Sequence, residues 1–406
     1  MSLAKVILVT AVLLALGLAT GFDLLLRVGY VLIGLVVISF LWSLAAIRSL
    51  TLERDTRNRR AQVGQTIEER LTVRNDSIVP KLWVEVRDHS TLPGHQISQA
   101  VSLAGKASKS WRARTTCKRR GKYLLGPVTI VSGDPFGLFH LQRHVRDTRS
   151  VLVYPETVPL PELNIRVGIL PGGSTIQHRV QYTTPNVAGI RDYVPGDGFN
   201  RIHWPSTARW QKLMVKEFEL DPFSDMWILL DMEAKYHHGV GDASSEEYSV
   251  KAAASLAHRF LQQNRSVGLA MYGPHRQLVT PDRGARQIWK LLEELAITKA
   301  TGRMPLAELM AAEATRFGRN TTLVLITPST SEDWIRALRG VTQSGTRAVV
   351  VVVDSASFGG QESLAWIIDS LAGNAVPTFV RRKGDALDRV FVGGDISPIS
   401  VPVSMQ

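Results

Sequence analysis

The sequence of 406 residues contains a single cysteine, Cys117. One cysteine cannot form a disulfide within the chain, so nothing in the fold requires an oxidising compartment. Acidic residues are also fewer than basic residues, 36 against 48, and the formal net charge is +12. Such a balance fits nucleic acid, an anionic membrane surface or a basic cytoplasmic face. Hydrophobic residues make up 45% of the chain, which is enough to bury a core over most of a length typical of two or three domains.

Charge is missing altogether from Val28 to Ile47, and the run from Leu3 to Phe22 carries only Lys5. Each run has about 20 residues, the length that a helix needs to cross a hydrocarbon core of about 30 Å. Helices are the expected form, because lipid cannot satisfy backbone polar groups. We therefore predict a two-helix transmembrane hairpin in residues 1–50, with helices over about 3–22 and 28–47.

Lysine and arginine predict the orientation of this hairpin. The link between the runs offers only Arg27, whereas the segment after the second run contains Arg48, Arg54, Arg57, Arg59 and Arg60. The positive-inside rule places that segment in the cytoplasm. We expect a multi-pass protein of the cell membrane whose water-soluble domains face the cytoplasm. A cleaved signal peptide is disfavoured because a second span follows at once, and buried soluble helices are disfavoured because both runs lack a polar face.

Helical periodicity is absent from residues 51–155, where apolar and polar residues alternate. Leu82, Val84 and Val86 alternate with Trp83 and Glu85. This period of two, interrupted by turn sequences, predicts a small domain resembling a β-sandwich. A basic stretch runs through this region at Arg112, Arg114, Lys118, Arg119, Arg120 and Lys122. It has two interpretations, the solvated face of a strand and its turn, or a surface for anionic lipid or an acidic partner.

Residues 156–224 have the composition of a linker, but the stretch from Gly189 to Glu219 is dense in residues of special chemistry. Its arginine forks can hold carboxylates, and its tryptophans offer large contact areas. Two interpretations remain open, an internal ion-pair network that clamps the linker and a partner-binding surface. The residues concerned are Arg191, Asp192, Tyr193, Pro195, Gly196, Asp197, Ile202, Trp204, Arg209, Lys216 and Glu217.

This stretch resembles the signature of the bacterial family named domain of unknown function 58. The usual form is Arg-(Glu/Asp)-Tyr-x-Pro-Gly-Asp, followed by Ile-x-Trp, Ala-Arg and Val-Lys-Glu. The sequence departs from it at His203, where the family usually has Asp. The run from Gly133 to Phe139 also resembles the family. The resemblance implies two spans, a β-rich domain, the signature, and then an α/β domain.

Unbroken apolar, β-branched runs alternate with helical patterns in residues 225–406. This alternation predicts a doubly wound α/β domain with a parallel sheet covered on both faces. Asp231 follows the first strand, at the carboxyl end where such sheets bind ligands. In family terms the domain resembles a von Willebrand factor A domain.

That resemblance implies a divalent cation held by Asp-x-Ser-x-Ser after the first strand. Here Asp231 is followed by Met232, Glu233, Ala234 and Lys235, so both serine positions are lost and an ammonium group would repel a cation. A hard cation such as Mg²⁺ needs several oxygen ligands. We therefore expect no cofactor and no metal, with Asp231 as a weak candidate ligand. The adjacent His237 and His238 lack the spacing and cysteine companions of a zinc site.

The sequence contains no Walker lysine loop and no Gly-x-Ser-x-Gly elbow, and the signature stretch holds no nucleophile–base pair, which argues against an enzyme. It also lacks RNP-like and helix-turn-helix patterns, which disfavours nucleic acid. The family resemblance implies a MoxR-type AAA+ ATPase as partner. We therefore expect a membrane-tethered, non-enzymatic adaptor or scaffold in protein-complex assembly or remodelling. The alternatives are a divalent-metal-dependent binding or adhesion module and a basic peripheral binder of anionic lipid or nucleic acid.

Overall fold

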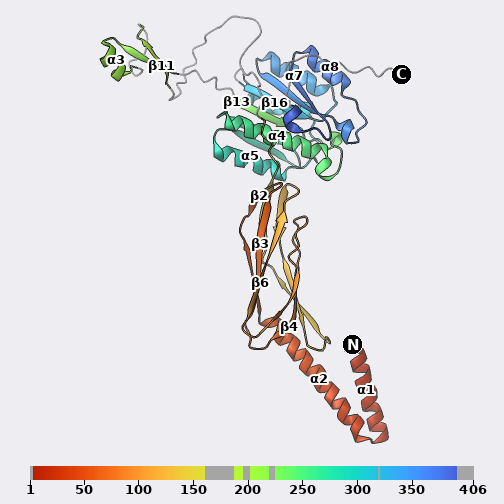
Figure 1. The fold of residues 1–406 in the computed structure, drawn as a ribbon. Coiled ribbons are helices and arrows are strands. Elements are labelled where there is room, and N and C mark those ends of the chain that lie inside the picture. Colours follow the sequence, from red (N-terminus) through yellow and green to blue (C-terminus); the bar gives the residue numbers. More distant parts are fainter. Residues whose placement is uncertain (1–2, 161–186, 195–201, 219–224, 319–320, 391–406) are drawn as a thin grey trace. The chain divides into compact units, whose positions relative to one another are not determined.

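The computed structural model describes residues 3–160, 187–194, 202–218, 225–318 and 321–390 (Figure 1). The chain divides into two compact units. The first contains Met1–Thr157 together with Val240–Asp242 and Trp289–Lys299, and the second contains the remainder. Each unit is described by itself.

Two apolar helices begin the first unit, α1 (Leu3–Thr20) and α2 (Asp23–Arg48). Both are long and apolar enough to cross a membrane, and little of either is buried. This finding suggests a membrane anchor. The second helix begins earlier than predicted and includes the expected link, because the chain reverses within two residues at Gly21, whose φ of +67° suits glycine.

Three small sheets follow α2. Their strand orders are β1-β3-β6, β2-β10-β7 and β5-β4-β8-β9. The strands are β1 (Leu50–Thr56), β2 (Arg60–Gln62), β3 (Thr66–Asn75), β4 (Lys81–Asp88), β5 (Gln99–Leu103), β6 (Ser108–Thr116), β7 (Gly121–Leu125), β8 (Val128–Gly133), β9 (His140–Val145) and β10 (Arg149–Tyr154). One core cluster joins Ile47 of α2 to Leu71, Val84 and Ile130 of the sheets. A second cluster contains Cys117, where burial raises the pKa of the thiol.

The second unit contains a six-stranded sheet with the order β15-β14-β13-β16-β17-β18. Its strands are β13 (Asp225–Leu230), β14 (Val267–Tyr272), β15 (Arg276–Asp282), β16 (Thr321–Thr327), β17 (Arg347–Val353) and β18 (Thr378–Arg381). The expectation of a wholly parallel sheet is wrong at one edge, because β15 runs antiparallel to β14. Only the short segment between Tyr272 and Arg276 joins these strands, and a parallel crossover needs a longer connection.

Helices cover this sheet. They are α4 (Ser245–Gln262), α6 (Leu306–Glu313), α7 (Asp333–Gln343), α8 (Ala365–Gly373) and α9 (Leu387–Val390). The helix α5 (Ala285–Ile297) belongs for the most part to the first unit, which includes Trp289–Lys299. Leu309 of α6, Leu338 of α7 and Ile367 of α8 share one core with Leu229 and Leu325 of the sheet. Strands buried in this way need apolar residues at every position, which explains the unbroken runs in the sequence.

The signature region forms an antiparallel pair, β11 (Val187–Asp192) with β12 (Met214–Phe218), and a short helix, α3 (Trp204–Trp210), lies between them in the chain. We call residues 187–194 and 202–218 the signature hairpin. Pro195, Gly196 and Asp197 lie outside the described residues.

Candidate functional site

The helix α3 of the signature hairpin begins at His203, the position at which the sequence departs from the family pattern. The Nδ1 atom of His203 accepts a hydrogen bond of 3.3 Å from the backbone amide of Ser206, and Pro205 occupies the first turn. A side chain at the start of a helix that accepts a hydrogen bond from the backbone amide three residues later is an N-cap. Asp is among the residues preferred in this role. The histidine therefore performs a local structural task that an aspartate can also perform.

The end of α3 is joined to β12 by main-chain and side-chain contacts. Gln211 has a left-handed conformation, with φ of +51°, which ends the helix. The backbone amide of Met214 then donates to the hydroxyl of Thr207 at 3.0 Å and the backbone amide of His203 donates to the carbonyl of Met214 at 2.8 Å. Ile202 and Val215 are both buried and form a bridge. These contacts hold the helix against the strand pair.

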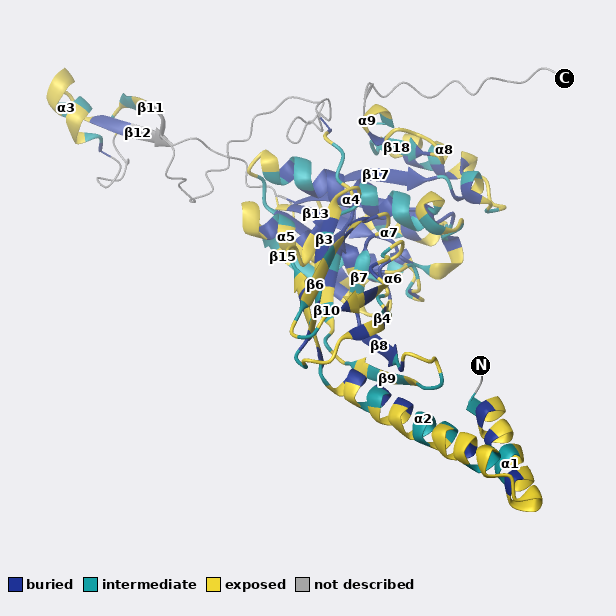
Figure 2. Cartoon of the chain, turned by 60° about the horizontal axis from the view of Figure 1, so that its bottom comes forward, coloured by how far each residue is buried: buried dark blue, intermediate teal, exposed yellow. Residues whose placement is uncertain are grey.

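Two tryptophans of α3 are largely exposed, Trp204 at 64% and Trp210 at 65%. Much of α3 is coloured as exposed in Figure 2. The carboxylate of Asp192 pairs with the ammonium of Lys212 at 2.8 Å, and the guanidinium of Arg191 donates to the carbonyl of Asp192 at 3.0 Å. The ion pair and the hydrogen bond both lie at the surface. The hairpin thus combines large aromatic side chains with a charged rim.

The predicted signature residues come together only in part. Arg191, Asp192 and Tyr193 belong to β11 and its end, while Trp204 and Arg209 belong to α3. Lys216 and Glu217 are strand residues of β12. Lys212, which the sequence analysis did not select, supplies the ion pair with Asp192. A lysine separated from its partner by 20 positions gives no local signal of that pairing.

A second place of interest is the edge of the sheet in the second unit. The strands β14 and β16 flank β13 on opposite sides, so the winding of the sheet reverses between β13 and β16. Doubly wound sheets bind ligands outside the carboxyl ends of strands at such a point. Asp231 follows β13 and Thr327 ends β16, so both lie there as the sequence predicted for Asp231.

Asp231 is buried, and both oxygens of its carboxylate accept hydrogen bonds within the chain. Its Oδ1 accepts from the backbone amide of Glu233 at 3.0 Å, and its Oδ2 accepts from the hydroxyl of Thr327 at 2.6 Å. Burial raises the pKa of Asp231 to about 6, although the Thr327 and Glu233 hydrogen bonds act in the opposite direction. The backbone carbonyl of Asp231 also accepts from Nε2 of His237 at 3.0 Å.

These residues do not fit the divalent cation that a von Willebrand factor A resemblance implies. Hydrogen-bond donors take both oxygens of Asp231, and Lys235 stands at the second serine position. Thr280 and Asp282 carry oxygens that could add ligands to such a cation, but they lie in β15, which is separated from β13 by β14. Within the described ranges no three His, Cys, Asp or Glu side chains are grouped to hold a metal ion. The expectation of a metal-free protein stays a prediction.

An open cleft of about 530 Å³ adjoins this edge. It is lined by Lys235, Tyr236, Thr330, Ser331, Glu362, Ser363 and Trp366. The ammonium of Lys235 lies 4.9 Å from the centre of the Tyr236 ring and 3.3 Å from its hydroxyl. One lysine and one glutamate give the lining no net charge that would select an ion of either sign.

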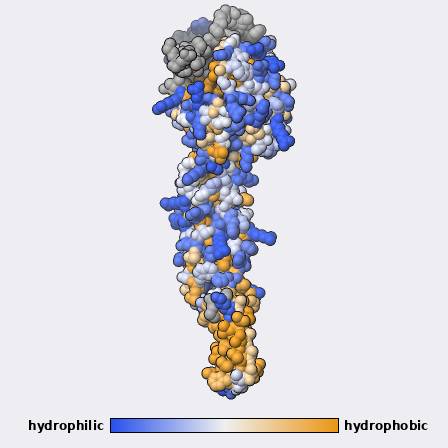
Figure 3. Space-filling model, turned by 90° about the vertical axis from the view of Figure 1, so that its right-hand side faces the viewer, coloured by the Kyte–Doolittle hydropathy of each residue, from blue (hydrophilic) through white to orange (hydrophobic). Residues whose placement is uncertain are grey.

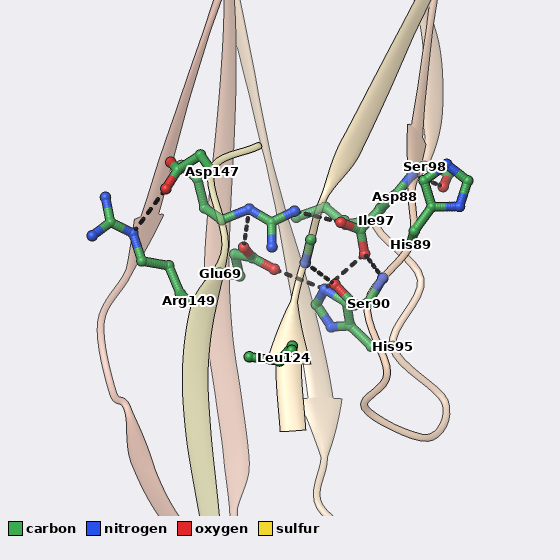
Figure 4. Close-up of polar contacts among 12 residues, drawn as sticks. Glu69, Asp88, His89, Ser90, His95, Ile97, Ser98, Leu124, Asp147 and Arg149 are labelled. Atoms are coloured by element: carbon green, nitrogen blue, oxygen red, sulfur yellow. Dashed lines mark hydrogen bonds and ion pairs between the residues drawn. The ribbon is translucent and has the colours of Figure 1, made fainter. Parts of the chain in front are cut away.

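The first unit buries an ionic cluster between its sheets (Figure 4). The guanidinium of Arg54 contacts the carboxylate of Glu69 at 3.0 Å and that of Asp88, while Nε2 of His95 lies 2.7 Å from Glu69. These side chains are at most 3% exposed. Both carboxylates contact the guanidinium of Arg54 inside the protein. We assign the cluster to the interior of the β-rich region.

The basic stretch of the first unit is divided between surface and interior. Arg112 and Arg114 lie 3.4 Å and 3.8 Å from Glu68 on the solvent face. Arg120 is buried, and its guanidinium donates to the carbonyls of Leu295 and Thr298 at 3.0 Å and 2.9 Å. This arrangement favours a structural role over a continuous anion-binding surface.

Comparison with known proteins agrees with the signature. Residues 189–358 match the family model described as "Protein of unknown function DUF58". This match supports the resemblance to that family. An uncharacterised protein of Bacillus subtilis, YeaD, is 23% identical over 318 residues, which cover 75% of this chain and 77% of the relative.

Likenesses to solved structures are weak. The CARDB domain of the PF1109 protein from Pyrococcus furiosus covers 26% of this chain and 91% of its own, with 19% identity and a TM-score of 0.20. Proximal thread matrix protein 1 from the mussel byssus covers 42% of this chain and 45% of its own, with 10% identity and a TM-score of 0.32. Scores at this level support no argument about fold or function.

Proposed function

We propose that this chain is a membrane-tethered, multi-pass, non-enzymatic adaptor or scaffold whose signature hairpin binds a MoxR-type AAA+ ATPase. The observation that carries the proposal is the pair of exposed tryptophans, Trp204 and Trp210, on one short helix. Tryptophan is the residue type most enriched at the energetic centres of protein interfaces, and large exposed apolar groups mark contact sites.

The construction of the hairpin supports this role. A two-stranded sheet is marginally stable by itself in water, so such a unit gains stability by docking. Its rim carries Arg191, Arg209 and Lys212, which can pair with carboxylates of a partner. A partner surface with acidic groups around an apolar depression would match it.

The proposal requires the domains after the membrane anchor to lie in the same compartment as the ATPase. The arginines after α2 predict cytoplasmic domains, and an ATPase requires cytoplasmic ATP. The doubly wound second unit would then be a von Willebrand factor A-like domain whose sheet edge presents or receives a client. A metal-dependent binding module is disfavoured by the occupied carboxylate of Asp231 and by Lys235.

Affinity capture from native membranes tests this proposal. The full chain, solubilised in detergent, is purified with and without ATP as the wild type, Trp204→Ala and Arg191→Ala. Arg336→Ala is the matched control, because Arg336 is an exposed arginine of α7 that pairs only with the exposed Glu332 and Asp333 among the residues described. Circular dichroism checks that each variant is folded.

We expect wild type and Arg336→Ala to retain an AAA+ ATPase, and the two hairpin variants to lose it while remaining folded. Recovery of no ATPase by the wild type under either condition would contradict the adaptor function. Unfolding of both hairpin variants would support the other interpretation of the signature, an internal clamp.

A further inference from the structure

Exposed apolar side chains gather at one end of the β-rich region of the first unit. Within residues 51–160 the large hydrophobic residues at the surface are Ile78, Val79, Leu82, Trp83, Leu124 and Phe136. All except Leu124 belong to two segments, 78–83 and 134–139. We call Ile78, Val79, Leu82, Trp83 and Phe136 the apolar collar. Ile78 is 81% exposed and Phe136 is 56% exposed, which is costly in water.

The first collar segment is attached to the last turn of α2. The backbone amide of Asp76 donates to the carbonyl of Ser49 at 2.8 Å, and Nζ of Lys81 donates to the carbonyl of Ala45 at 3.3 Å. Lys81 is buried, which lowers the pKa of its ammonium. A cation on the last carbonyls of a helix satisfies groups that have no partner within the helix.

The second collar segment lies beside the preceding turns of α2. The rings of Phe40 and Phe139 meet edge to face with their centres 5.5 Å apart. The hydroxyl of Ser43 donates to the carbonyl of Phe139 at 3.4 Å. The segment 134–139 therefore lies beside residues 40–43 of α2, at the same position along the helix axis.

The number of residues along α2 indicates how deep this position lies in a membrane that the helix spans. A hydrocarbon core of about 30 Å takes about 20 helical residues. If Asp23 marks the far edge of this core, the near edge falls at about Trp42, and if Arg27 marks it, the near edge falls at about Ala46. Phe40 lies inside both limits, and Ser43 lies one residue beyond the first limit and inside the second. The segment 134–139 beside them is then at the level of the membrane interface.

Asp134 fixes the shape of this segment. Its Oδ2 accepts from the backbone amide of Phe136 at 2.9 Å, and its Oδ1 accepts from the backbone amide of Phe139 at 2.6 Å. Burial acts to raise the pKa of Asp134, but the backbone hydrogen bonds outweigh it and lower the pKa below its ordinary value. Gly137, with φ of +70°, completes the turn. Phe136 thus lies exposed on a turn that these hydrogen bonds hold together.

We propose that the apolar collar inserts into the interfacial layer of the bilayer that α1 and α2 span, so that the β-rich region is seated on the membrane. Trp83, which meets His140 edge to face at 5.6 Å, and the exposed Arg48 are residues suited to that layer. The hydrophobic surface of the two helices continues onto the adjoining end of the β-rich region (Figure 3). This continuity favours lipid over a protein partner as the occupant. The inference rests on the membrane anchor of the proposed function.

Depth-dependent fluorescence quenching tests the inference on the full chain. In a Cys117→Ala background, the single cysteine variants Phe136→Cys, Val31→Cys and Leu124→Cys are labelled with a nitrobenzoxadiazole fluorophore. Val31, a 71% exposed residue of α2, reports insertion of the helix. Leu124 is a matched control, because it is apolar and 45% exposed but lies in β7, next to the core cluster that excludes α2. The proteins are reconstituted in phosphatidylcholine vesicles containing doxyl-labelled lipid.

We expect doxyl lipid to quench the labels at residues 31 and 136 at least twofold and to leave the label at 124 unchanged. Iodide in the water should quench only the label at 124. If the label at 31 is not quenched by lipid, the anchor itself fails and the proposed tethering fails with it. If the label at 31 is quenched but that at 136 responds only to iodide, the inference alone is overturned. Shielding of residue 136 from both quenchers would mean that protein covers the collar, which also overturns it.

Discussion

The hydroxyl of Thr327 donates a hydrogen bond of 2.6 Å to the buried carboxylate of Asp231, although the two residues are 96 positions apart. They meet because β13 and β16 are neighbouring parallel strands that end at the same edge of the sheet. This contact supplies one oxygen of the buried carboxylate with a hydrogen-bond donor from the chain itself. The hydrogen bond therefore holds a titratable carboxyl group inside the core at the edge of the sheet.

The buried carboxyl of Asp231 predicts a dependence of stability on pH. The unfolded chain loses this proton near the ordinary pKa of 3.8, whereas the folded chain keeps it until about pH 6. The free energy of unfolding should therefore fall as pH rises from about 4 to 6, by about 3 kcal/mol in total. The variant Asp231→Asn should lack this fall, as measured by denaturant unfolding of the full chain in detergent between pH 4 and pH 7.

The exposed Asp225, on the same strand, supplies the control for that measurement. Asp225→Asn should unfold with the same dependence on pH as the wild type. An unchanged pH dependence in Asp231→Asn would show that this carboxyl does not carry the effect.

The N-cap of α3 predicts an effect on the signature hairpin. His203→Ala removes the acceptor for the amide of Ser206 and should destabilise the helix by about 1 kcal/mol. His203→Asp, which supplies the residue usual in the family, should restore or increase its stability. Hydrogen exchange of the Ser206 amide is the measurement, and equal exchange in all three proteins would contradict the capping role.

The buried ionic cluster predicts a large loss of stability on removing one partner. Glu69→Gln leaves the guanidinium of Arg54 with less compensation in the interior and should cost about 3–5 kcal/mol. Glu68→Gln is a matched control, since Glu68 precedes Glu69 on β3 but pairs with Arg112 on the solvent face. Loss of a surface pair should cost about 0–1 kcal/mol. Thermal unfolding compares the two, and equal losses would contradict the difference in burial.

The carboxylate of Asp134 predicts sensitivity of the collar segment to acid. Because the folded state lowers the pKa of Asp134, its contribution is present above the ordinary value of 3.8 and is lost as pH falls through the lower, folded pKa. Asp134→Ala should lose hydrogen bonds worth about 1.5–3 kcal/mol each at neutral pH. Exchange protection at the amides of Phe136 and Phe139 measures this, and protection that survives the substitution would rule out the role.

The sequence by itself determined the local elements. The charge-free run after Val28 identified a helix long enough for a membrane, since an apolar surface on all sides suits only lipid or a core. Alternation at Val84 and Val86 identified a strand with one buried face, and the unbroken runs identified strands covered on two faces. Leu82, which belongs to the same alternation, is instead 62% exposed, because the register of β4 shifts between Lys81 and Val84. These features follow from the period of the backbone, which each segment carries within itself.

Only the tertiary structure decided which distant residues meet. Arg54, Glu69 and Asp88 come from different strands, and no short pattern links them into a buried cluster. In the same way, the contact of Phe40 with Phe139 ties the end of α2 to a loop about a hundred positions later in the chain. Strand order and packing create such contacts, because the energy gained from burying paired surfaces depends on the whole fold rather than on neighbours in sequence.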